Sequence, residues 1–148
     1  MKTKLLKILL FVALGGVLLL AGAYAGYRGY KSIRQARLVK EAREYLEKNE
    51  LRKAQLCLQR AVRYNNRDLE TCRLMAQLSD ASGSRTGALV WRGRVVELNP
   101  TSLEDRVALV QAALADGDYA TATNTIAGFD QSGRKTSAYH KTAGAVAG

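Results

Sequence analysis

The chain has 148 residues, of which 47% are hydrophobic, and 23 Lys and Arg against 13 Asp and Glu give it a formal net charge of +10. The single His140 and the cysteines Cys57 and Cys72 match neither a catalytic constellation nor a zinc-ligand spacing, and no phosphate-binding glycine motif is present. We therefore predict no catalytic, cofactor-binding or metal-binding residue, and the sequence gives no sign of a small-molecule substrate.

The first 27 residues divide into a basic tail, residues 1–7, and an uncharged segment, residues 8–27. The tail carries Lys2, Lys4 and Lys7, and the segment holds twenty residues without a charge. At about 1.5 Å per residue, a helix of this length matches the roughly 30 Å hydrocarbon core of a bilayer. The sequence predicts a transmembrane helix over residues 8–27.

A cleavable signal peptide is the alternative for the same segment. A basic region precedes the apolar run, and Ala23 and Ala25 fit a small-x-small cleavage site that would release the chain after Ala25. We favour the uncleaved anchor, because the run is longer than the roughly 7–15 apolar residues of a signal peptide. The glycines Gly22 and Gly26 have the spacing that lets two membrane helices pack closely.

Residues 28–34 are predicted to form a basic juxtamembrane helix that leads into the folded part. Basic residues recur along this stretch and just beyond it, at Arg28, Lys31, Arg34, Arg37 and Lys40. Such a cluster is attracted to anionic lipid headgroups by about 1 kcal/mol per charge. Residues 68–148 carry eight bases and nine acids, so we expect no nucleic-acid binding, which needs a basic stripe across the folded surface.

Several kinds of residue recur at intervals of 34. Asn49, Gly83 and Gly117 form one such series, and Ala54, Ala88 and Ala122 form another. Glycine, or asparagine as second choice, ends a helix in the left-handed conformation, and a small residue one turn into the next helix allows close packing. The spacing predicts helix hairpins, with each second helix capped by Glu50, Ser84 or Asp118.

The stretches AVRYNNRDLE and VVELNPTSLE, also 34 residues apart, predict the turns between hairpins. Pro100 prevents the preceding helix from continuing, and Asp68 and either Thr101 or Ser102 are predicted to cap the helices that follow. Apolar residues recur at helical spacing throughout, and no segment alternates as a strand would.

A helix–turn–helix period of 34 residues resembles the tetratricopeptide repeat (TPR) family. The small positions read Ala42, Ala76, Val110 and Gly144 in first helices, although the aromatic position is kept only at Tyr45. The resemblance implies an all-α fold, in which an N-terminal transmembrane helix precedes a TPR-like α-solenoid of antiparallel hairpins. The expected units are 35–68, 69–102, 103–136 and an incomplete 137–148, which we expect to continue in a longer protein.

The concave surface of such a solenoid is expected to bind a protein partner. The candidate partner-binding residues there are polar positions of first helices that we expect to be exposed: Arg43, Arg73, Gln77, Arg106 and Gln111.

The expected function is that of a non-catalytic, membrane-anchored scaffold for protein–protein interaction in a bacterial type of protein. Two alternatives stay open: an exported periplasmic TPR protein that assists export or polysaccharide and envelope assembly, and an enzyme with its catalytic domain beyond Gly148. The excess of bases from Arg28 to Arg43 favours a single-pass topology with a cytoplasmic solenoid, although a periplasmic solenoid stays open.

Overall fold

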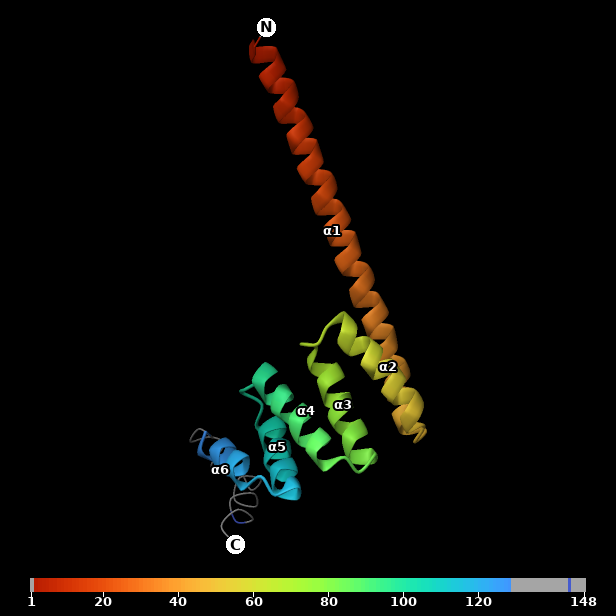
Figure 1. Ribbon diagram of the computed structural model, residues 1–148, viewed down its shortest axis with the longest axis vertical. Coiled ribbons are helices and arrows are strands. Elements are labelled where there is room, and N and C mark those ends of the chain that lie inside the picture. The colour runs from red at the N-terminus through yellow and green to blue at the C-terminus, as the bar shows by residue number, and fades with distance from the viewer. Residues whose placement is uncertain (1, 129–143, 145–148) are drawn as a thin grey trace.

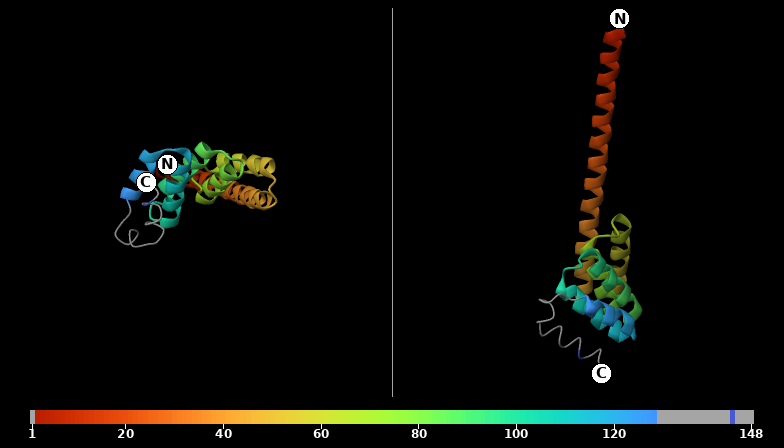
Figure 2. Two further views of the ribbon diagram at one scale, coloured as in Figure 1. Left: turned by 90° about the horizontal axis from the view of Figure 1, so that it is seen from below. Right: turned by 90° about the vertical axis from the view of Figure 1, so that its left-hand side faces the viewer.

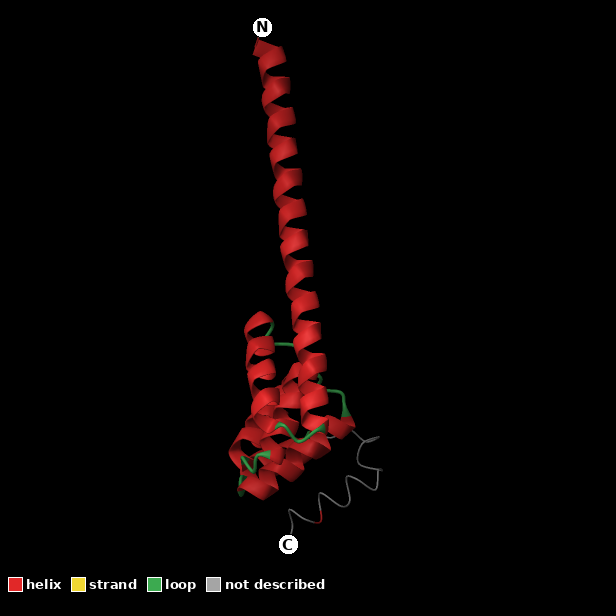
Figure 3. Ribbon diagram, turned by 90° about the vertical axis from the view of Figure 1, so that its right-hand side faces the viewer, coloured by secondary structure: helices red, strands yellow, loops and turns green. Residues whose placement is uncertain are grey.

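A computed structural model describes the backbone of residues 2–128 and 144, and the side chains of these residues except 2–14, 21, 25 and 28. Within the described residues every regular element is a helix, which confirms the predicted all-α class (Figure 3). The helices are α1 (Lys2–Glu47), α2 (Leu51–Tyr64), α3 (Leu69–Ala81), α4 (Arg85–Leu98), α5 (Leu103–Asp116) and α6 (Tyr119–Ala127). The predicted unit 137–148 and His140 lie outside the described residues, apart from Gly144.

Helix α1 is one continuous element of 46 residues, which at 1.5 Å per residue makes it about 70 Å long. Its N-terminal part projects far beyond the other helices, of which α2 and α3 pack against the C-terminal part of α1 (Figures 1 and 2). The basic stretch from residue 28 therefore continues the helix of the uncharged segment without a linker.

No helix in the described part of the chain is both long and apolar enough to span a membrane. The transmembrane helix over residues 8–27 therefore stays a prediction from the sequence.

The three hairpin turns have the same backbone geometry. Asn49, Gly83 and Gly117 adopt positive φ angles of 57°, 75° and 83°. In each turn the next amide donates to the carbonyl five residues back, as from Ser84 to Ser79 at 2.8 Å. The positive-φ residue itself donates to the carbonyl three residues back. This pair of bonds defines the Schellman ending, which satisfies the last carbonyls of the helix, so the predicted turns are confirmed.

The predicted helix caps are confirmed in part. Asp68, Ser102 and Asp118 accept hydrogen bonds from the first-turn amides of α3, α5 and α6 at 2.9–3.2 Å. Ser84 and Glu50 make no such bond. Both Ser84 and Asp118 have ψ below 90°, and only the longer Asp118 side chain reaches an amide from this conformation.

The small residues of the 34-residue series are in the core. Ala54, Ala88 and Ala122 are at most 3% exposed, and so are Ala42, Ala76 and Val110. Because they carry little bulk, the two helices of each hairpin pack closely, and Leu58 and Leu74 fill the space between hairpins. The packing follows chain order: each helix contacts the next, and α1 also contacts α3, which gives a solenoid-like stack (Figure 1).

Candidate functional site

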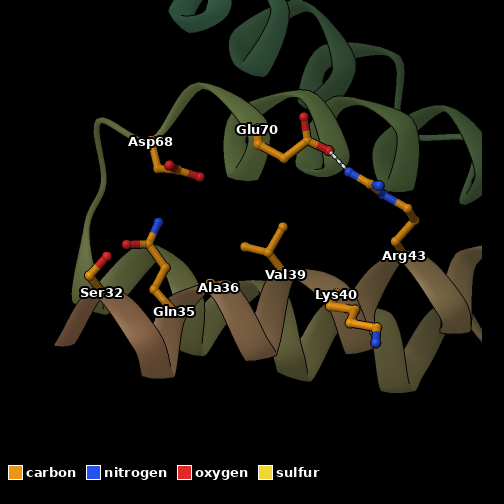
Figure 4. A pocket seen from close by; sticks show the side chains of 8 residues that line it. All are labelled: Ser32, Gln35, Ala36, Val39, Lys40, Arg43, Asp68 and Glu70. Carbon is orange, nitrogen blue, oxygen red and sulfur yellow. Dashed lines mark hydrogen bonds and ion pairs between the residues drawn. The ribbon is translucent and has the colours of Figure 1, made fainter. Parts of the chain in front are cut away.

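The first helices α1 and α3 enclose a hollow of about 310 Å³. Figure 4 shows its side chains: one wall comes from α1, and the opposite wall from the start of α3 and the turn before it. The lining residues are Ser32, Gln35, Ala36, Val39, Lys40, Arg43, Asp68 and Glu70. Six of these residues are polar or charged, although more of the exposed lining surface is apolar than polar.

A second hollow of about 230 Å³ lies one repeat further on, lined by residues of α3, α4 and α5. Its residues Arg73, Gln77 and Glu104 stand 34 positions after Val39, Arg43 and Glu70 of the first hollow. Three lining residues of each hollow thus occupy equivalent repeat positions, while the second hollow also includes Arg92 and Val95 of α4. We call the surface that carries the two hollows the first-helix face.

Two ion pairs cross the first-helix face and join consecutive first helices. The Arg43 guanidinium on α1 donates to the Glu70 carboxylate on α3. On α3, Arg73 donates to both carboxylate oxygens of Asp105 on α5, from Nε at 3.1 Å and from Nη2 at 2.6 Å. Such bidentate geometry is the strong form of the arginine–carboxylate bond.

Asp105 is the most buried charged group of this face, with its residue only 8% exposed. Burial alone would raise the pKa of this carboxyl, but hydrogen bonds from Arg73, Ser102 and Asn99 outweigh it and hold the pKa below its usual value. The same contact raises the pKa of the Arg73 guanidinium. The pair is therefore ionised over the physiological range and fixes α5 against α3.

The structure places the five candidate partner-binding residues unequally. Arg43, Gln77 and Gln111 are exposed and stand 34 positions apart, one per first helix. Arg73 is only half-exposed because it pairs with Asp105, contrary to the expectation that it is exposed. Arg106 is also half-exposed, and its guanidinium lies against Gly128 at the end of α6, away from both hollows.

A buried polar contact in the wall of the first hollow was not predicted. The Gln35 side chain, 8% exposed, donates to the hydroxyl of fully buried Thr71 at 3.3 Å, and Thr71 donates to the Asp68 carboxylate at 2.5 Å. The contact links α1 to the cap of α3. Gln35 and Thr71 are 36 residues apart, and neither belongs to a recognisable motif, so the sequence offers no signal for it.

The part of α1 before its contacts with the other helices carries a second unpredicted feature, a series of exposed tyrosines. Tyr24, Tyr27 and Tyr30 lie at intervals of three residues and are each more than half exposed. The ammonium group of Lys31 lies 4.7 Å from the centre of the Tyr27 ring, and the Arg34 guanidinium lies 5.2 Å from that of Tyr30. Tyrosines with adjacent cations are typical of the membrane–water interface.

Of the predicted basic cluster, Arg34, Arg37 and Lys40 are exposed and Lys31 is half-exposed, while the Arg28 side chain is not described. Gly22 and Gly26 are also exposed, and a Cβ atom at either would meet nothing within 4 Å. Both groups are thus accessible on the surface of α1.

The two cysteines are free thiols. Burial raises the pKa of both thiols; Glu41 adds to the effect at Cys57, and Arg94 opposes it at Cys72. Thiols with raised pKa values are poor nucleophiles and metal ligands. Within the described residues no group of three or more His, Cys, Asp or Glu side chains could hold a metal ion.

Comparison with known protein families and with curated proteins finds no match to this chain.

Proposed function

We propose that this protein is a membrane-anchored, TPR-like scaffold that binds a protein partner on its first-helix face and carries out no chemistry of its own. The observation that carries the proposal is the presence of two hollows on that face, lined mostly by polar and charged residues, three of which recur at the interval of the repeat. Repeat proteins of this architecture use such an extended surface to hold another polypeptide.

The distribution of interactions over the face supports this role. The Arg43–Glu70 and Arg73–Asp105 pairs fix the first helices against one another. Gln77 and Gln111 are exposed beside them. An amide side chain both donates and accepts hydrogen bonds, so it suits the backbone of an extended peptide.

The membrane anchor is the second part of the proposal. It rests on the uncharged residues 8–27 and on the tyrosines and cations that follow them. The unbroken helix α1 supports it further, since a rigid connection would hold the first hairpin near the headgroups. The excess of bases after the segment favours a cytoplasmic solenoid.

Site-specific photocrosslinking in intact membranes tests the binding face. A photoreactive residue at Gln77 or Gln111 would stand on the first-helix face, and Val90 and Asn124, exposed on the second helices α4 and α6, are matched controls. The proposal predicts that Gln77 and Gln111 crosslink to the same protein while the controls do not. Equal crosslinking from both faces, or none from the first-helix face, would contradict it.

A further inference from the structure

A third hollow, of about 520 Å³, lies between α1 and α2, away from the first-helix face. Arginines from both helices line it, two from α1 and two from α2, with one carboxylate and two less polar residues beside them. The lining residues are Arg34, Arg37, Leu38, Glu41, Arg60, Arg63 and Tyr64. The two arginines of α2 thus line the same hollow as Arg34 and Arg37 of the basic cluster on α1.

Among the described residues, most of the positive charge in this hollow has no carboxylate partner. Arg37 pairs with Glu41 at 3.1 Å. The Arg34 guanidinium donates to the Tyr30 hydroxyl at 2.9 Å. Among the residues that the structure describes, neither Arg60 nor Arg63 forms a side-chain hydrogen bond or an ion pair. Three of the four guanidinium groups, those of Arg34, Arg60 and Arg63, therefore have no carboxylate partner within the described residues.

The chemistry of the walls suits a phosphate group. A guanidinium presents a planar fork of N–H donors that matches two phosphate oxygens, and several forks around one site give more attraction than a single cation. The Tyr64 ring and the Leu38 side chain supply an apolar edge beside the arginines. A ligand with a phosphate next to an apolar portion, such as a phospholipid, fits both parts of the lining.

The position of the hollow along α1 points to the same ligand. Arg34 follows Tyr27, the last residue of the predicted membrane segment, by seven residues, or about 10 Å along the helix. The headgroup layer on each face of a bilayer is roughly 5–8 Å thick, and an arginine side chain spans the remaining distance. Because α2 runs back along α1, its C-terminal end with Arg60 and Arg63 lies on the side of the projecting part of α1 (Figure 1).

We propose that the hollow between α1 and α2 binds the phosphate of an anionic phospholipid headgroup. This inference rests on the proposed membrane anchor for its lipid source. Its consequence is a fixed orientation: a lipid held between α1 and α2 would hold the first hairpin against the bilayer and leave the first-helix face open to a partner.

Native mass spectrometry of the full chain in detergent micelles tests the site. The chain is mixed with phosphatidylglycerol or with phosphatidylcholine, and the lipid retained per chain is titrated. The double variant Arg60→Gln, Arg63→Gln removes the α2 half of the hollow. The control Arg52→Gln, Arg85→Gln removes the same charge from exposed positions outside it.

We expect the wild-type chain and the control to retain phosphatidylglycerol over phosphatidylcholine. The Arg60, Arg63 variant should bind phosphatidylglycerol about tenfold more weakly or worse, since each basic residue near the headgroups contributes on the order of 1 kcal/mol. The single variant Glu41→Gln, which removes the only acid among the described lining residues, should bind phosphatidylglycerol more tightly. Unchanged circular dichroism establishes that each variant is folded.

Equal retention by the two double variants would overturn the inference, and so would no preference for phosphatidylglycerol. Competition with millimolar inorganic phosphate or with a short RNA separates the sources of the anion. Displacement of the lipid by inorganic phosphate or by the RNA would assign the hollow to that ligand instead. The membrane anchor is tested separately, because the micelle titration does not depend on it. A chain that does not sediment with cell membranes would refute the proposed anchor.

Discussion

Arg73 on α3 donates two hydrogen bonds to the carboxylate of Asp105 on α5, 32 residues further along the chain, and so joins two consecutive first helices. The carboxylate is 10% exposed and the guanidinium is 39% exposed. Asn99, which ends α4, donates to the same carboxylate at 3.3 Å. The Asp105 side chain therefore links α5 to both α3 and the end of α4, and so connects the second hairpin to the third.

Replacing Asp105 with asparagine should lower the free energy of unfolding by about 2 kcal/mol, because it leaves a half-buried guanidinium without its charged partner. The matched control is Glu70→Gln, which breaks the more exposed Arg43–Glu70 pair and should cost less than about 1 kcal/mol. Thermal unfolding of the full chain in mild detergent, followed by circular dichroism, measures both. Equal losses from the two variants would contradict a special role for Asp105.

Acidification should weaken the same joint. The folded state lowers the pKa of Asp105, so the carboxylate stabilises the fold above its unfolded pKa of about 3.9, and this stabilisation is lost as the pH falls through the lower folded value. The hydrogen bonds that Thr121 donates lower the pKa of Asp118 and act in the same direction. The difference in melting temperature between the wild-type chain and Asp105→Asn should therefore shrink from pH 6 to pH 3. A constant difference would rule out ionisation of Asp105 as its cause.

The turn glycines should be sensitive to substitution while a glycine within a helix is not. Gly117 has a φ of 83°, so Gly117→Ala places a Cβ atom in the left-handed region and should cost about 1–2 kcal/mol of stability. Gly93 lies within α4, where an added Cβ meets nothing within 4 Å, so Gly93→Ala should stabilise the fold by about 0.5–1 kcal/mol. Melting temperatures that move in opposite directions would agree with the structure, and a stabilising Gly117→Ala would not.

The two thiols should react with alkylating reagents at different rates. Cys72 is 1% exposed and Cys57 is half-buried, and burial raises the pKa of both. At pH 7 we expect slow labelling of Cys57 and none of Cys72 until the chain unfolds, as read by mass spectrometry of single-cysteine variants. Rapid labelling of Cys72 in the folded chain would show that α3 is not packed as described.

The sequence was sufficient for the hairpins because their turns depend on local chemistry. The left-handed conformation of each turn depends on one residue and its immediate neighbours, and it occurs at Asn49, Gly83 and Gly117. The alanines that follow these turns are buried, as the 34-residue spacing predicts. The caps were partly predictable, since Ser84 has the right residue type but its hydroxyl does not reach an amide.

The side-chain contacts between repeats were not predictable in this way. Arg73 was expected to be an exposed partner-binding residue, but the register of α5 on α3 places Asp105 within its reach. Likewise, the sequence identifies Arg60 and Arg63 only as two basic residues of a second helix. The packing of α2 against α1 brings them into one hollow with Arg34. Both arrangements depend on how helices pack, which residue spacing alone does not determine.

The membrane anchor is tested most directly by alkaline carbonate extraction of cell membranes, with mass spectrometry of the N-terminus and protease treatment of a C-terminal tag. We expect a carbonate-resistant, full-length chain that keeps residues 1–25, with a tag protected from protease in intact cells that lack their outer layers. A soluble chain that begins at Gly26 would contradict it and would favour the exported form released by cleavage after Ala25.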